Sequence, residues 1–246
     1  MQSSANVGTE VAFDITSPSN DRIKWLVRLG ERRHRDREGL FVVEGGRLYR
    51  RALNAGLIPV ITFVSGPDRH DLAGETLSVV PGVLDKASYR KRSEGLIGVF
   101  PQFETTLNRI ELSPTPLLLI AENIEKPGNL GAMMRTAAAA GAEALITVGS
   151  TVDPFNPNSL RTSTGAVFTL PLAVSSWDEA GPWLEKGGIE VIGASPDAGI
   201  PLWTTDLRGP VAVVIGAEDT GLSERAASVA RQLVAIPRPR PAGSTR

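Results

Sequence analysis

The most chemically suggestive side chains in the sequence are an asparagine and an arginine near the start of one predicted helix. In EKPGNLGAMMRTAAAAGA (125–142), Asn129 follows a proline–glycine pair and Arg135 comes six residues later. Arginine stays protonated in proteins, so Arg135 is a poor general base. It can instead hold a phosphate at a helix start and lower the pKa of a nearby hydroxyl. Asn129 caps the helix or orients Arg135 or a substrate, and these interpretations are compatible.

A second stretch, VVIGAEDTGLSE, places Glu218 directly after an apolar run and between Gly216 and Gly221. One interpretation is structural, because an acid is stabilised near the start of a following helix. The other is functional, with the carboxylate orienting Asn129 or Arg135, or contacting the nucleotide. Glycines on both sides allow a close backbone approach, which favours the functional interpretation.

Both stretches belong to the second half of the chain, where apolar runs alternate with helical patterns. Strands are expected at 117–123, 144–149, 190–195, 211–218 and 233–237, and helices at 130–140, around 158–164, at 177–186 and at 224–231. Near-continuous Val/Ile/Leu strands alternating with helices predict a parallel sheet covered on both faces. Ligands of such sheets bind beyond the carboxyl ends of the strands, which directs attention to NIEKPGN, GASPDAG, GAEDTGLS and PRPRPAGS.

The first half predicts a smaller α/β domain. DRIKWLVRL and RLYRRALNAG are typical of helices, the latter stopped at Gly56, and GLFVVEGG, PVITFVSG, LSVVPG and GLIGVFP are typical of strands. The polar, proline-closed segment ETTLNRIELSPTP is the candidate linker. We therefore expect a flexible tail at 1–16, an accessory domain at 17–103, a linker at 104–116 and a C-terminal domain at 117–246.

Positive charge is concentrated near the N-terminus, although the whole chain has a net charge of −1. Residues 22–51 hold ten basic side chains, nine of them arginine, against four acids. Arginine suits bidentate phosphate contacts, and the acids are too few to pair most of these side chains. A solvated helix face remains the alternative to nucleic-acid binding. The predicted RNA contacts here are Lys24, Arg28, Arg32, Arg33, Arg35, Arg37 and Arg47.

Several chemistries are excluded by what the sequence lacks. The absence of cysteine excludes disulfides, zinc–thiolate sites, iron–sulfur clusters and cysteine nucleophiles, and two histidines disfavour a histidine metal site or general base. Neither a dinucleotide-binding glycine fingerprint nor a P-loop is present. No apolar run approaches a membrane span, and no signal-peptide pattern begins the chain. We expect a cytoplasmic protein with no metal and no membrane contact.

Several ordered motifs together resemble one family. ENIEKPGNLGAMMRTAAAAGA is similar to the first motif of the SpoU/TrmH branch of the SPOUT RNA methyltransferases, and VVIGAEDTGLSE to the second. DPFNPNSLRTSTGAVFTLP resembles the segment between them, with Arg161, Ser163 and Gly165 at its recurring positions. FVVEGGRLYRRALNAG and EGLIGVF look like the ribosomal-protein-like RNA-binding domain that many members carry. Ala217 departs from the family pattern, where relatives more often have a polar residue.

The resemblance implies 2′-O-methylation of a ribose in rRNA, with S-adenosyl-L-methionine as the cofactor. The expected substrate is 23S rRNA. It also implies an α/β trefoil-knot domain and a homodimer with active sites at its interface. The implied catalytic residues are Asn129, Arg135, Glu218 and Ser244. The implied cofactor-binding residues are Ala194, Ser195, Ile215, Gly216, Ala217, Gly221, Ile236 and Pro237. Arg161 and Ser163 are expected to bind RNA phosphate, with a capped surface helix as the alternative.

The match stops at the third motif. LVAIPRPRPAGSTR begins like that motif and ends at Arg246, before the long C-terminal helix that the family usually carries. Two interpretations follow: a truncated version of a longer chain, or a degenerate member that binds RNA without methylating it. A tRNA 2′-O-methyltransferase is a further alternative, although the separate basic domain favours rRNA.

Overall fold

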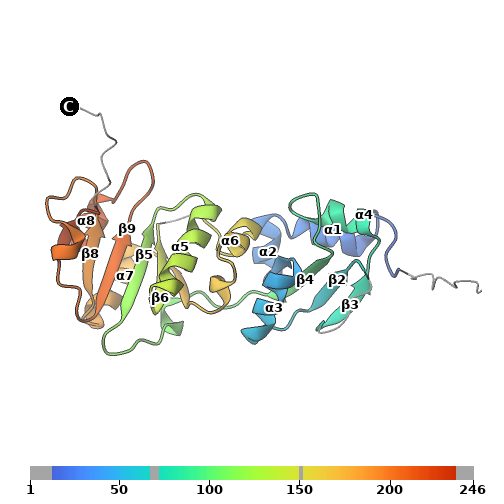
Figure 1. Ribbon diagram of the computed structural model, residues 1–246, viewed down its shortest axis with the longest axis horizontal. Coiled ribbons are helices and arrows are strands. Elements are labelled where there is room, and N and C mark those ends of the chain that lie inside the picture. The colour runs from blue at the N-terminus through green and yellow to red at the C-terminus, as the bar shows by residue number, and fades with distance from the viewer. Residues whose placement is uncertain (1–12, 67–71, 150–151, 237–246) are drawn as a thin grey trace, which may run out of the picture. The chain divides into compact units, whose positions relative to one another are not determined.

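The computed structural model describes residues 13–66, 72–149 and 152–236, and the chain divides into two compact units, Met1–Gln102 and Phe103–Arg246 (Figure 1). The first unit contains α1 (Asp21–Arg28), α2 (Arg32–Glu38), β1 (Leu40–Glu44), α3 (Gly46–Asn54), β2 (Ile61–Val64), β3 (Glu75–Ser78), α4 (Pro81–Ala87) and β4 (Leu96–Pro101). Its sheet has the order β1-β4-β2-β3. β4 is antiparallel to both of its neighbours, whereas β2 and β3 are parallel.

The first unit folds around a core shared by its helices and its sheet. Asn20 caps α1 by accepting a hydrogen bond from the Arg22 backbone N at 2.9 Å, and the helix buries Ile23 and Leu26. These side chains pack in one cluster with apolar residues of β2 and β4, among them Phe63. α2 and α4 were not predicted. The sequence of α2, RRHRDRE, has no apolar periodicity, and α4 begins at a proline that reads as a turn but suits the first helical position.

The second unit is built on six parallel strands, which confirms the predicted parallel sheet. The strands are β5 (Leu117–Glu122), β6 (Ala144–Val148), β7 (Leu172–Ser175), β8 (Glu190–Ala194), β9 (Val211–Ile215) and β10 (Gln232–Val234). The α-helices are α5 (Pro127–Ala139), α6 (Pro157–Thr162), α7 (Trp177–Lys186) and α8 (Glu224–Val229), with 3-10 turns at Leu107–Arg109, Ala166–Phe168 and Leu202–Thr204. The edge strand β7 has four residues and was missed because its apolar run is so short.

The strand order of this sheet, β10-β8-β9-β5-β6-β7, locates the site. The chain leaves β5 toward β6 and β7, whereas it leaves β9, the neighbour of β5 on the other side, toward β10 beyond β8. The direction of winding therefore reverses between β5 and β9. In an open parallel sheet such a reversal leaves a ligand crevice at the carboxyl ends of the two strands.

Close helix packing explains one glycine of the alanine-rich helix. A Cβ on Gly131 of α5 would lie 2.0 Å from Thr162 Oγ1 and 2.4 Å from the Ser159 carbonyl oxygen of α6. Only a glycine lets the two helices approach this closely. On the α7 side of the sheet, Trp177 and Leu184 join Leu118 in the main core.

Candidate active site at the strand ends

The loops that follow β5 and β9 meet through three polar side chains. Glu218 Oε2 lies 2.5 Å from Lys126 Nζ and accepts a 3.4 Å hydrogen bond from Asn129 Nδ2. All three side chains are exposed. The structure therefore brings the predicted Asn129 and Glu218 together, and it adds Lys126, which sequence reasoning missed. A basic residue directly before the helix-starting Pro127 was the available signal.

The Lys126–Glu218 contact changes the acidity of both groups. The hydrogen bond and charge of Lys126 lower the pKa of the Glu218 carboxyl, with a smaller contribution from Asn129. Glu218 in turn raises the pKa of Lys126. The lowered pKa means that Glu218 keeps its carboxylate form, which accepts hydrogen bonds from Asn129, to lower pH than it would alone.

Arg135 lies on the same helix but away from this cluster. Six residues along an α-helix correspond to a rise of about 9 Å and a rotation of about 120° from Asn129. Arg135 is exposed and forms no ion pair within residues 13–66, 72–149 and 152–236. Its guanidinium is thus available to a ligand from solvent.

A buried carboxylate supports the two loops from behind. Glu122, at the end of β5, is 1% exposed and accepts hydrogen bonds from Trp177 Nε1 at 2.6 Å, Ser223 N at 2.8 Å and Ser223 Oγ at 2.5 Å. These bonds tie the ends of β5, α7 and the β9 loop together. Sequence reasoning missed Glu122, although one acid at the end of the apolar run LLLIAEN was a signal.

The β9 loop itself is a tight turn with Glu218 near its tip. Ala217 and Gly221 exchange two backbone hydrogen bonds of 3.0 Å each. A Cβ on Gly216 would lie 2.1 Å from the Gly221 carbonyl oxygen, and Gly221 has a φ of 68°. Both positions therefore require glycine, and the turn presents Glu218 toward α5.

The residues predicted to bind the cofactor gather at the same edge of the sheet. Ala194 pairs with Ile215 on one side and with Val234 on the other, so the ends of β8, β9 and β10 are adjacent. Ser195 N donates to the Val234 carbonyl oxygen at 2.9 Å. Adjacent to one another at these ends are Ala194, Ser195, Ile215, Gly216, Ala217, Gly221 and Ile236. The predicted Pro237 and Ser244 lie outside the described residues.

Two predicted RNA contacts are wrong, because their side chains are buried. Arg35 is 1% exposed, and its guanidinium donates to the carbonyl oxygens of Leu29 at 2.8 Å and Gly30 at 2.7 Å. Ser163 is fully buried, and its hydroxyl donates to the Leu160 carbonyl oxygen at 2.7 Å. Neither group can reach a phosphate. Arg161 is exposed and donates to the Asn158 side chain.

The expectation that acids are too few to pair most arginines of residues 22–51 does not hold within α1 and α2. Most basic side chains of α1 and α2 are in ion pairs: Arg22–Glu75, Lys24–Asp21, Arg32–Asp36, Arg33–Glu31 and Arg37–Glu38. Two of the acid partners, Asp21 and Glu75, lie outside residues 22–51, and Glu75 is distant along the chain. The local excess of charge therefore overstated the number of free guanidinium groups.

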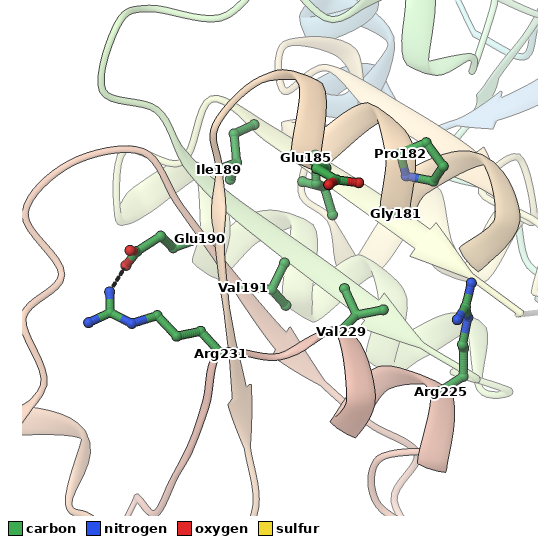
Figure 2. Close-up of a pocket in the computed structure, with 10 residues that line it drawn as sticks. Gly181, Pro182, Glu185, Ile189, Glu190, Val191, Arg225, Val229 and Arg231 are labelled. Carbon is green, nitrogen blue, oxygen red and sulfur yellow. Dashed lines mark hydrogen bonds and ion pairs between the residues drawn. The ribbon is translucent and has the colours of Figure 1, made fainter.

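The second unit also has a hollow of about 470 Å³ between α7, α8 and the start of β8 (Figure 2). Val191 and Val229 are among the residues that line it, and Figure 2 shows Arg231 pointing toward Glu190, with which it pairs. Glu190 begins β8, whereas the cofactor candidates follow its end. The hollow is therefore separate from the candidate active site.

In the described ranges, no cluster of three or more His, Cys, Asp or Glu side chains is arranged to hold a metal ion. Among the same residues, none of the helices has the length and apolarity needed to cross a membrane.

Comparison with known proteins identifies the motifs. Residues 116–244 match the model of the SpoU rRNA Methylase family, and residues 20–98 match that of the MRM3-like substrate binding domain. The chain belongs to the SpoU rRNA methylase family. The expected fold class is an α/β SPOUT methyltransferase domain that follows a smaller α/β domain in the sequence. These matches and the similar solved structures confirm it.

Three relatives illustrate the similarity along the chain. A 23S rRNA (uridine(2479)-2′-O)-methyltransferase of Streptomyces viridochromogenes is 28% identical over 93% of this chain and 85% of its own. A solved RNA 2′-O ribose methyltransferase is 39% identical, with a TM-score of 0.82 over 94% of this chain and 92% of its own. An AdoMet-bound rRNA methyltransferase from Sinorhizobium meliloti is 29% identical, with a TM-score of 0.85 over 94% and 91%.

Proposed function

We propose that this protein is an enzyme that transfers a methyl group from S-adenosylmethionine to the 2′-hydroxyl of a ribose in rRNA. The observation that carries the proposal is the meeting of Asn129 and Glu218 at the winding reversal between β5 and β9. That site lies in a chain similar over nearly its whole length to an AdoMet-bound rRNA methyltransferase.

The neighbouring ends of β8, β9 and β10 fit a cofactor of this kind. Ser195, Ile215, Ala217 and Ile236 follow or end adjacent parallel strands, at the edge where ligands of open parallel sheets bind. Gly216 keeps side-chain bulk out of the turn beside them. When bound, S-adenosylmethionine supplies an electrophilic methyl group, and these residues would hold it.

The exposed side chains provide what the reaction needs from the protein. A ribose 2′-hydroxyl is a very weak acid, so it must be positioned in line with the methyl donor and must lose its proton to solvent at this exposed site. Arg135 holds the phosphate of the target nucleotide, and its charge lowers the pKa of the adjacent hydroxyl. Asn129, oriented by Glu218, hydrogen-bonds the ribose. Lys126 lowers the pKa of the Glu218 carboxyl, so the carboxylate needed for that role persists to lower pH.

We propose further that the enzyme acts as a homodimer. Arg135 is exposed and lies about 9 Å further along α5 than Asn129, and among the residues that the structure describes its guanidinium forms no ion pair. The family resemblance supports an active site at a subunit interface. Sedimentation equilibrium of the full chain tests this: a monomer at micromolar concentration would contradict it.

The deciding experiment has two readouts. Mapping of 2′-O-methyl groups in protein-free 23S rRNA, incubated with cofactor and with or without the full chain, should show one new modified ribose. Calorimetry should show S-adenosylmethionine binding. Cofactor binding with methylation of tRNA alone would favour the tRNA alternative, and absence of cofactor binding would favour a non-catalytic RNA-binding protein.

A further inference from the structure

The first unit carries a second basic surface made by two segments distant in sequence. Arg47, Arg50 and Arg51 belong to α3, and Arg90, Lys91 and Arg92 to the loop between α4 and β4. We call these six residues the α3–loop patch. Five of them are exposed and Arg51 is half-buried. On α3 the three arginines lie opposite the buried Tyr49 and Ala52, because they are three or four residues apart.

Backbone and side-chain contacts hold the two segments against each other. Glu44, at the end of β1, accepts hydrogen bonds from Tyr89 N at 2.6 Å and Ser88 Oγ at 2.8 Å. Gly45 N donates to the Leu96 carbonyl oxygen at 2.9 Å. Gly45 has a φ of 90°, and a Cβ on it would lie 2.4 Å from Glu94 Oε2. The start of α3 therefore lies directly beside the loop that carries Arg90 to Arg92.

Within the described residues, the basic side chains of the α3–loop patch are not neutralised by ion pairs, whereas most of those on α1 and α2 are. Across the part of the chain that the structure describes, none of its six basic groups is in an ion pair. Two acids lie beside the patch: Glu44, which is engaged by Ser88 and Tyr89, and Glu94, which is exposed. A surplus of uncompensated positive charge remains. The guanidinium groups of Arg32, Arg33 and Arg37, by contrast, already have carboxylate partners.

We propose that the α3–loop patch is the surface with which the first unit binds the phosphate backbone of folded rRNA, and that α1 and α2 present a solvated face. RNA binding gains free energy when basic groups release counterions condensed on phosphates, and an unpaired arginine contributes more than one already neutralised by an acid. Tyr89 is 53% exposed within the loop and offers a ring for an unstacked base. This inference rests on the proposed function, and it names the RNA-binding surface of the same enzyme.

The test compares two charge-matched triple variants of the full chain. One carries Arg90→Ser, Lys91→Ser and Arg92→Ser, and the control carries Arg32→Ser, Arg33→Ser and Arg37→Ser. Binding to protein-free 23S rRNA is measured between 0.1 and 0.3 M salt, where the Debye length is about 10 Å or less. The loop variant should reduce the slope of log affinity against log salt by about one per lost phosphate contact, up to about three. The control should change the slope by less than one such contact.

The outcomes separate this inference from the proposed function. Urea denaturation shows whether the first unit is folded in both variants, and unchanged S-adenosylmethionine affinity in calorimetry shows that the second unit is intact. If the wild-type chain methylates rRNA but the loop variant binds it with an unchanged salt slope, the patch assignment fails and the function stands. An equal or larger loss in the α1–α2 variant also overturns the assignment, and restores the charge run of residues 22–51 as the RNA contact. A wild-type chain that binds no rRNA contradicts both.

Discussion

The candidate active site has a buried side and an exposed side, and they are built in opposite ways. Behind the loops, Glu122 is almost fully buried and accepts three hydrogen bonds from Trp177 and Ser223. In front of them, Asn129, Arg135 and Glu218 are exposed. The buried side fixes the positions of the loops without any ligand, whereas the exposed side is left to contact a large substrate from solvent. Preorganised support behind adaptable contact groups is the arrangement that positional catalysis requires.

The largest effect on activity should come from the exposed side. Arg135→Ala should reduce kcat for methyl transfer by about 10²–10³-fold, because it removes a charge that stabilises the developing alkoxide. S-adenosylmethionine affinity should remain close to that of the wild type, since Arg135 is not among the strand-end residues. Single-turnover methylation of rRNA and calorimetry measure the two quantities.

An exposed arginine elsewhere in the second unit provides the control. Arg208 pairs with Asp206 in a surface loop, and Arg208→Ala should leave both kcat and cofactor affinity unchanged. If Arg135→Ala retains activity within a few-fold, or loses cofactor affinity in parallel with activity, then Arg135 does not have the proposed role.

The next effect should come from the buried side and should concern folding and the cofactor. Glu122→Ala leaves three donors without their acceptor, each costing about 1–3 kcal/mol when buried. The free energy of unfolding should fall by about 3 kcal/mol or more, and S-adenosylmethionine affinity should fall because the β9 loop loses its anchor. Urea denaturation and calorimetry test this.

Glu125 offers a matched control, since it is an exposed glutamate three residues further along the same segment. Glu125→Ala should change neither stability nor cofactor affinity. A Glu122→Ala variant that keeps wild-type cofactor affinity while losing stability would show that Glu122 supports the core but not the loop.

The sequence predicted the parallel sheet, the bounds of α7 and a role for Glu218 beside Asn129 or Arg135, of which the structure shows the contact with Asn129. Each prediction depends on local periodicity or on the rule that parallel strands end at one edge. The sequence-based predictions failed where the burial or pairing of a side chain depended on residues on other elements of the fold. Arg35 looked like its neighbours in a charged run, but the carbonyl oxygens at the end of α1 draw its guanidinium inside. Arg22 looked unpaired because its partner, Glu75, belongs to β3.

The smallest expected effect tests the link between the two loops, namely the ion pair of Lys126 with Glu218. Lys126 lowers the pKa of the Glu218 carboxyl, so the carboxylate form persists to lower pH than it would alone. In Lys126→Met that pKa should rise toward its ordinary value, and Glu218 should become protonated at a higher pH. At neutral pH the carboxylate is ionised with or without Lys126, so activity there should stay within about threefold of the wild type, as expected for an exposed pair.

The pH dependence therefore carries the test. The acid limb of kcat/KM should move to higher pH in Lys126→Met, and carbon NMR of the Glu218 carboxyl should show the same direction of change. Lys186→Met, at the exposed end of α7, is the matched control and should leave the acid limb in place. The pKa of Glu218 measured by NMR could rise in Lys126→Met while the acid limb of kcat/KM stays in place. Ionised Glu218 would then be dispensable for catalysis, and Asn129 would be oriented by the helix start alone.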